Sequence, residues 1–219
     1  MGKNIKKTLE ILKDYLKDQR KTTLNREGKD NKTFTPYQTL ISCLLSLRAK
    51  DEVTEIISKE LFKIADTPEK MLKIPEKQLK KIIFSSGHFN KKAEALRSVS
   101  KELIERFNSK VPETRDELIS IKHIGPKTAN IVLCFSFDKE VIPVDVHVHV
   151  LANRLGWVKT DTAEKTEFEL MKVLPKQYWT EINGIFVLFG KTICETRLPH
   201  CSICPLKKLC PKIGVIKNR

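Results

Sequence analysis

The sequence of 219 residues is 40% hydrophobic, which is enough to bury a core and excludes a disordered chain. Lysine and arginine number 41 against 27 aspartate and glutamate, and the formal charge of +14 indicates a polyanionic partner, either nucleic acid or an anionic membrane surface, unless the whole proteome is rich in lysine. No apolar run approaches the roughly 18 residues of a spanning helix, and the start MGKNIKKTLE has no signal-peptide core. We therefore expect a cytoplasmic protein without a targeting segment and without a membrane partner.

Helical periodicity predicts an all-α fold with short connections. Ile5, Leu9, Leu12 and Leu16 would line one face of a first helix, and the polar residues 17–33 then break the pattern. Thr35 is expected to cap a central buried helix that has Pro36 at its first position. Further helix-sized segments lie at 51–64, 68–74, 76–85, 90–107, 114–121, 126–136, 161–173 and 178–193.

The segment VIPVDVHVHVLANRLG, residues 141–156, allows two interpretations. Its alternating valines are typical of a strand. Apolar residues also recur at i, i+3, i+4 and i+7, namely at Val148, Leu151, Ala152 and Leu155. We favour a helix that Asp145 caps and Gly156 ends. His149 would be an ordinary exposed residue of this helix.

Four cysteines crowd into residues 194–210 with the spacing C-x6-C-x2-C-x5-C: Cys194, Cys201, Cys204 and Cys210. Four thiolates can close around one soft metal centre, and so short a segment has too little apolar content to order itself without one. The uneven spacing favours a [4Fe-4S] cluster over structural zinc, which more often uses two separated C-x2-C pairs. Disulfides or unliganded thiols remain as alternatives. Cys43 and Cys134 lie in apolar helical patterns and are expected to be small buried side chains.

The stretch IKHIGPKTANIVL predicts a helix–turn–helix hairpin at about residues 115–136. Such a turn exposes backbone N–H groups that can bind a phosphate oxygen, although many helical pairs turn on glycine and bind nothing. With Gly125 as the cap and Pro126 as the first residue, Lys127 falls in the first turn. The helix field there disfavours the ammonium form, and a neutral amine is a nucleophile. The alternative is a solvated lysine.

Together, the hairpin, the segment 141–156 and the cysteine ending resemble the endonuclease III branch of the helix-hairpin-helix DNA glycosylases. With LISCLLSLRAKD and SSGHFNKKAEAL, the resemblance extends over nearly the whole chain. It implies an all-α fold of two helical lobes with a DNA-binding cleft between them. The six-helix barrel would span 29–139, and the second lobe would combine 1–28 with 140–219 and carry the cluster loop 194–210.

The resemblance further implies a bifunctional DNA N-glycosylase and AP lyase. Its partner would be duplex DNA that contains a damaged base, chiefly an oxidised pyrimidine, or an abasic site. The matching positions make Lys127 the nucleophile that attacks C1′ of the flipped-out nucleotide and Asp145 the essential carboxylate, although a plain N-cap would also explain Asp145. They make the four clustered cysteines the ligands of a [4Fe-4S] cluster. We expect a monomer, associated with the nucleoid of a prokaryote.

Three positions depart from the family pattern, and all three are predicted DNA contacts. His123 replaces a common hairpin glycine, although histidine tolerates positive φ better than most residues. Arg48 stands where relatives often carry a gap-filling glutamine, and His88 stands at the place of an apolar wedge. Gly125 and Arg197 are further predicted contacts, both to the phosphate backbone.

Three other functions compete with this interpretation. A monofunctional glycosylase for mismatched thymine, uracil or adenine would use water, and Lys127 argues against it. A non-catalytic DNA-binding protein gives no reason for Lys127 and Asp145 to occur together. A redox protein is compatible with the cysteine spacing, but the rest of the chain shows no second cofactor site.

Overall fold

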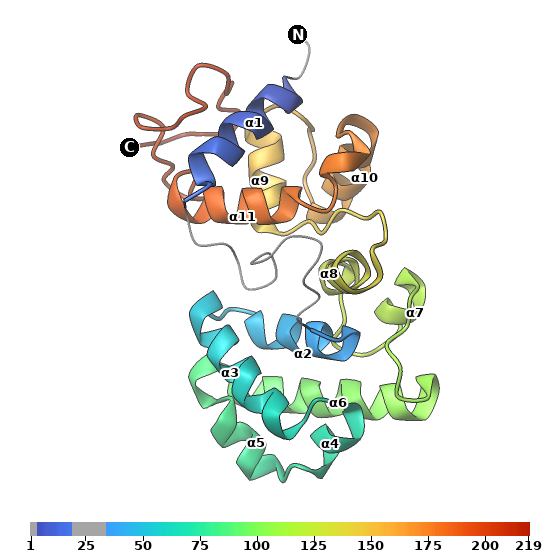
Figure 1. The fold of residues 1–219 in the computed structure, drawn as a ribbon. Helices are drawn as coiled ribbons and strands as arrows, with labels where there is room; N and C mark the ends of the chain where they lie inside the picture. Colours follow the sequence, from blue (N-terminus) through green and yellow to red (C-terminus); the bar gives the residue numbers. More distant parts are fainter. Residues whose placement is uncertain (1–3, 19–33) are drawn as a thin grey trace. The chain divides into compact units, whose positions relative to one another are not determined.

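The computed structural model describes residues 4–18 and 34–219, and over these residues the chain is all-helical, without a strand (Figure 1). The prediction of an all-α fold is confirmed. The chain forms two compact units: a terminal unit of residues 4–18 and 140–219, and a central unit of residues 34–139. The predicted boundary between residues 28 and 29, and most of the polar segment 17–33, lie outside the described residues. In the described part, no helix is long and apolar enough to cross a membrane.

Helix α2 (Pro36–Ser46) is the buried centre of the central unit, as its apolar sequence predicts. The Thr35 side chain accepts from the N–H of Gln38, and the Gln38 side chain accepts from the N–H of Thr35, which satisfies two donors that the helix itself leaves unpaired. Around α2 pack α3 (Asp51–Ile64), α6 (Phe89–Phe107) and α8 (Pro126–Phe137). Cys43 on α2 and Cys134 on α8 are both buried, as expected.

The remaining helices of the central unit are α4 (Pro68–Lys73), α5 (Glu76–Ile82) and α7 (Arg115–Ile119), with the 3₁₀ turn η1 (Phe84–Ser86) after α5. The helix expected over 76–85 therefore ends early. The hydroxyl of Ser86 donates to the Ile83 carbonyl at 2.6 Å and competes for an acceptor that a continuing helix would use. Gly87 then follows at φ +67°, which turns the chain away from the helix axis.

The terminal unit contains α1 (Ile5–Leu16), α9 (Val146–Arg154), α10 (Ala163–Val173), the turn η2 (Lys176–Tyr178) and α11 (Ile182–Thr192). Helix α11 packs against both α1 and α9 (Figure 1). The apolar stripe of α1 is buried as predicted, and the aromatic side chains of Trp157 and Phe186 lie in the same core, with ring centroids 5.3 Å apart. The helix expected over 178–193 begins only at Ile182, because Tyr178 belongs to η2 and residues 179–181 form a turn.

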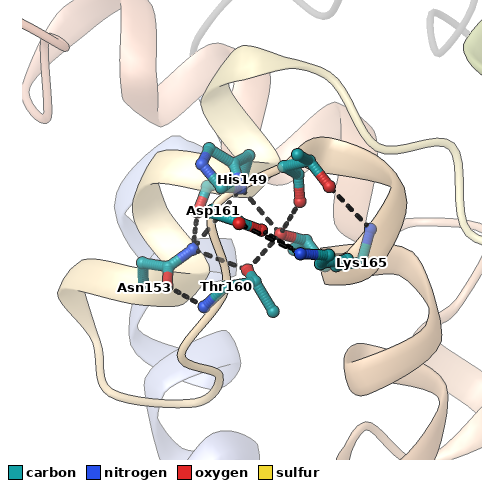
Figure 2. Close-up of polar contacts among 7 residues, drawn as sticks. His149, Asn153, Thr160, Asp161 and Lys165 are labelled. Carbon is teal, nitrogen blue, oxygen red and sulfur yellow. Dashed lines mark hydrogen bonds and ion pairs between the residues drawn. The ribbon is translucent and has the colours of Figure 1, made fainter.

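A polar network joins α9 to the start of α10 (Figure 2). Nδ1 of His149 lies 2.7 Å from Oγ1 of Thr166, so His149 is half-buried and bonded, and the expectation of an ordinary exposed residue was wrong. Asn153 accepts from the N–H of Thr160 at 2.9 Å and donates to the Thr160 hydroxyl at 3.1 Å. These bonds fix both the segment at Thr160 and helix α10 to α9, the helix that Asp145 caps.

Candidate functional site

The hairpin forms as the sequence predicts. Gly125 is the N-cap of α8, Pro126 is its first residue, and Lys127 follows in the first turn, where no acidic residue is present. The Lys127 side chain is exposed. His123 adopts the left-handed conformation with φ +72°, as expected of a residue that replaces glycine in the turn. The N–H of Ile124 donates to the carbonyl of Ile121 at 3.1 Å and closes the turn.

The packing of the protein does not explain the glycine at position 125. Its φ of −96° is open to any residue, and an added Cβ would meet no atom within 4 Å. A side chain here would instead stand beside the first backbone N–H groups of α8, which point out of the helix end. The position is therefore suited to the close approach of an anion such as a phosphate oxygen.

Cys43 on α2 lies near Lys127. Burial raises the pKa of the Cys43 thiol to about 12, while the positive charge of Lys127 acts in the opposite direction. The lysine thus extends from a first turn whose inner side packs on the buried helix α2. This packing fixes the backbone from which the amine projects.

Asp145 is the N-cap of α9, as predicted. Its Oδ1 accepts from the N–H groups of His147 at 2.9 Å and Val148 at 3.0 Å. The carboxylate is half-buried. The segment before it is fixed as well, because Asn183 of α11 donates to the Pro143 carbonyl at 2.8 Å. Lys127 belongs to the central unit and Asp145 to the terminal unit.

Arg48 and His88 are exposed residues of the central unit, and both have left-handed backbones. Arg48 follows α2 with φ +55°, and His88 is the N-cap of α6 with φ +49°. Together with His123, all three departures from the family pattern occupy this conformation. Side chains at such positions stand on turns and project from the unit's surface.

The four cysteines predicted as ligands line one pocket in the terminal unit. Arg154, at the end of α9, is buried beside them, and its Nη1 lies 3.3 Å from Sγ of Cys194. The same guanidinium donates to the carbonyls of Glu195 at 2.9 Å and Thr196 at 2.6 Å, so one side chain shapes the start of the loop. Arg154 was not among the residues predicted from the sequence. The signal for it was a charged residue at the end of the apolar stripe of a buried helix.

All four thiols are half-buried, and none of them forms a disulfide. Burial raises the pKa of the Cys204 thiol to about 11 and also raises the pKa values of Cys194 and Cys210. A cationic centre would be needed to hold them as thiolates.

Arg197 lies in the loop between Cys194 and Cys201 and is exposed. Behind it, the N–H of Arg219 donates to the carbonyl of Pro199 at 2.9 Å, and the carbonyl of Arg219 accepts from Ser202 at 2.9 Å. The loop is therefore braced by a second chain segment. Its exposed arginine stands on a fixed backbone.

Comparisons with known proteins agree with this arrangement. The family described as HhH-GPD superfamily base excision DNA repair protein matches residues 41–176. Endonuclease III of Thermotoga maritima (strain ATCC 43589 / DSM 3109 / JCM 10099 / NBRC 100826 / MSB8) is 41% identical over 201 residues, which cover 90% of this chain and 94% of that protein.

Two solved structures are similar over almost the whole chain. A non-covalent Endonuclease III-DNA complex superposes with a TM-score of 0.84 at 30% identity and covers 97% of this chain and 96% of that one. A trapped Endonuclease III-DNA covalent intermediate, in an estranged-adenine complex, gives a TM-score of 0.83 at 30% identity, with 97% of both chains covered. The resemblance of the motifs is thus confirmed over the full length, and the chain belongs to the endonuclease III branch of the HhH-GPD superfamily of base excision DNA repair proteins.

Proposed function

We propose that this protein excises oxidised pyrimidines from duplex DNA and then cleaves the abasic strand, with Lys127 as the nucleophile of both steps. The DNA glycosylase and AP lyase activity itself follows from its membership of the endonuclease III family. The observation that carries the role of Lys127 is its place: an exposed amine in the first turn of α8, directly after the Gly-Pro cap of the hairpin. We also propose that the protein acts at the nucleoid, in the cytoplasm of a prokaryote, because genomic DNA is the proposed substrate and a bacterial Endonuclease III is 41% identical to the chain.

The chemistry requires an extruded nucleotide, because C1′ cannot be reached inside the duplex. The Lys127 amine forms a bond to C1′ while the bond from C1′ to the base breaks, and the base leaves with the bonding pair and takes up a proton. Loss of one amine proton lets the nitrogen lone pair expel the ring oxygen O4′, which takes up a proton, and the product is an imine at C1′. Elimination then removes a proton from C2′, forms the C2′–C3′ double bond and breaks the C3′–O bond, so that the 3′ phosphate leaves and the strand is cut 3′ to the lesion. The similarity to the trapped Endonuclease III-DNA covalent intermediate supports this covalent route.

Asp145 combines two roles in this proposal. One carboxylate oxygen, Oδ1, receives both cap bonds, which hold the group at the start of α9. The negative charge of the carboxylate stabilises the positive charge that develops on the sugar as the base leaves. A group fixed in this way needs little reorganisation during the reaction.

The DNA contacts divide by chemistry. The hairpin offers His123 and the N-terminus of α8, where Gly125 has no side chain to cover the backbone N–H groups. It binds phosphate without reading the base sequence, and Arg197 adds a second contact to the DNA backbone. Arg48 and His88 fill the space that the extruded nucleotide leaves. We further propose that the central and terminal units act as the two lobes that bind the duplex, with 29–139 as the six-helix barrel.

We also propose that the four cysteines bind a [4Fe-4S] cluster. The pocket that all four line supports a shared centre, and their uneven spacing along the chain favours a cuboidal one. When bound, the cluster holds the loop in its folded form and so supports the position of Arg197. Brown protein with about four irons and four sulfides per chain is the expected result. Colourless protein with one zinc per chain contradicts it.

The decisive experiment uses a panel of duplexes that each contain one defined lesion. Base release and strand cleavage are scored separately, and borohydride is added during turnover to reduce the imine to a stable crosslink. A crosslink that maps to Lys127 supports the proposal, and a crosslink at another amine refutes it. Base release without any crosslink would identify a water-using glycosylase instead.

A further inference from the structure

A buried lysine, Lys92 on α6, joins the two segments that carry Arg48 and His88. Lys92 is only 5% exposed, and its Nζ donates to the carbonyl of Leu45 at 2.7 Å and to that of Ser86 at 2.8 Å. Leu45 belongs to the last turn of α2, and Ser86 ends η1. Burying an ammonium is unfavourable unless protein acceptors replace its water. These two carbonyls supply such acceptors.

Local hydrogen bonds shape each of the two segments separately. After α2, the N–H of Ala49 donates to the carbonyl of Ser46 at 3.0 Å. In η1, the N–H of Ser86 donates to the carbonyl of Ile83 at 3.0 Å. Each of these bonds stays within its own segment. The Lys92 ammonium bonds to both segments and therefore fixes one relative to the other.

Both connected segments also contain residues with left-handed backbone conformations. Arg48 has φ +55°, and Gly87 and His88 follow each other at φ +67° and φ +49°. Left-handed conformations are unfavourable for residues other than glycine and persist where the surroundings fix them. The His88 carbonyl also accepts from the backbone N–H of Lys92 at 3.1 Å, which is the first-turn bond of α6 and does not depend on the lysine side chain.

We propose that Lys92 is a positioning residue that sets the distance between the Arg48 and His88 segments, and thereby the fit of both side chains to the damaged site. The proposal rests on the DNA-contact role given to Arg48 and His88 above. Lys92 itself acts through the Leu45 and Ser86 carbonyls, since its ammonium is buried. The sequence offered no signal for this, because Lys92 stands in a lysine pair in a chain with 41 basic residues.

The test compares Lys92→Met with Arg97→Met. Methionine keeps the unbranched stem of Lys92 but removes both donors. Arg97 lies on the same helix, and its Nη1 donates to the Ile74 carbonyl at 2.8 Å, at the end of α4, which carries neither proposed contact. Each variant thus detaches a different segment from α6. Both variants lose side-chain hydrogen bonds to backbone carbonyls, so a general loss of stability is expected in both and does not explain a difference between them.

Amide hydrogen exchange reads the positioning directly and needs no DNA. Lys92→Met should raise exchange in residues 46–49 and 85–88 together, whereas Arg97→Met should raise it in residues 72–74. On a damaged duplex, kcat/KM of Lys92→Met should fall by about ten- to a hundredfold, the range expected for a small misplacement of contact groups. Arg97→Met should keep the wild-type value. Exchange that rises in one segment alone, or an unchanged kcat/KM, overturns the proposal.

The result separates this proposal from the proposed function. If the wild-type protein acts on no lesion, the proposed function fails, and the exchange pattern alone decides on Lys92. If Lys92→Met loses its helical circular dichroism, Lys92→Gln takes its place, since glutamine keeps an N–H donor on a shorter side chain. An intermediate loss of kcat/KM in Lys92→Gln supports the positioning role, and a wild-type value refutes it.

Discussion

The imidazole of His147 on α9 lies directly against the backbone of Gly190 on α11. A Cβ added at Gly190 would come within 2.9 Å of the His147 Cγ and closer still to its Nδ1. The backbone N–H of His147 donates to Oδ1 of Asp145. A glycine in one helix thus permits the placement of the residue beside the proposed catalytic carboxylate.

Gly190→Ala should therefore destabilise the protein, although alanine is the better helix former by up to about 1 kcal/mol. We expect a loss of about 1–3 kcal/mol from overpacking, together with a lower rate of base release, because the displaced ring moves the N–H that holds Asp145. Urea unfolding and single-turnover kinetics measure the two effects. A variant as stable and as active as the wild type would show that the His147 ring can move away freely.

Gly125→Ala should affect binding more than stability. No atom lies within 4 Å of the added Cβ and φ is −96°, so the folded state accepts alanine without a clash. Stability should change by less than about 1 kcal/mol, because alanine restricts the unfolded chain but is a poorer N-cap than glycine. Affinity for undamaged duplex should nevertheless fall, since the methyl group stands where the phosphate oxygen approaches. Fluorescence anisotropy at fixed salt measures the affinity. Unchanged binding would exclude the hairpin as a phosphate site.

Lys127→Ala should abolish borohydride crosslinking and strand cleavage while duplex binding stays nearly intact. One lysine among 41 basic residues contributes little to a distributed electrostatic contact. The exposed position of Lys127 also predicts a folded variant. The matched control is Lys122→Ala, an exposed lysine before the hairpin turn, which should crosslink as the wild type does. Strand cleavage that survives in Lys127→Ala would assign the nucleophile to another amine.

Two substitutions at Asp145 separate its cap role from its charge. Asparagine caps a helix about as well as aspartate, so Asp145→Asn should unfold at nearly the wild-type urea concentration, whereas Asp145→Ala should lose about 1 kcal/mol. Both should lose most of the rate of base release, because both lack the negative charge. If only the alanine variant loses activity, the carboxylate is a helix cap and nothing more.

The stability of the metal-free protein should depend on pH through the buried thiols, to the extent that its loop is folded. In the folded loop without metal, burial raises the pKa of Cys204 to about 11, above the value of about 8.5 in an unfolded chain. The native state then holds a proton that the unfolded state releases, so the metal-free protein loses stability as pH rises from about 8.5 toward 11. Loaded protein should lose less over this window, since its thiols are already ionised. Thermal unfolding of both forms across this range measures the difference. Parallel losses in both forms would argue against these thiols as ligands.

N-cap residues and prolines at first helical positions predicted most helix starts correctly. The Thr35 cap, the Gly125-Pro126 start and the Asp145 cap each depend on a few neighbouring residues, and all three are present. The early end of the 76–85 helix was missed because a single Ser86 hydroxyl competes for a backbone carbonyl.

The bonds of long side chains were not predictable either. Lys92 reaches a carbonyl 47 residues away and Arg154 reaches carbonyls 40 to 42 residues away. Hydrophobic periodicity contains no information on such pairs. The partners become known only when the fold brings the segments together.

The left-handed backbone shared by Arg48, His88 and His123 has an evolutionary consequence. The fold requires only a residue that tolerates positive φ at these positions, and glycine and asparagine also meet this requirement. On the roles proposed for Arg48 and His88, selection on these exposed side chains comes from the DNA and hardly at all from the protein interior. Substitutions at these two positions should then alter which damage is repaired without compensation elsewhere, so lineages can diverge in lesion range while their scaffold stays the same.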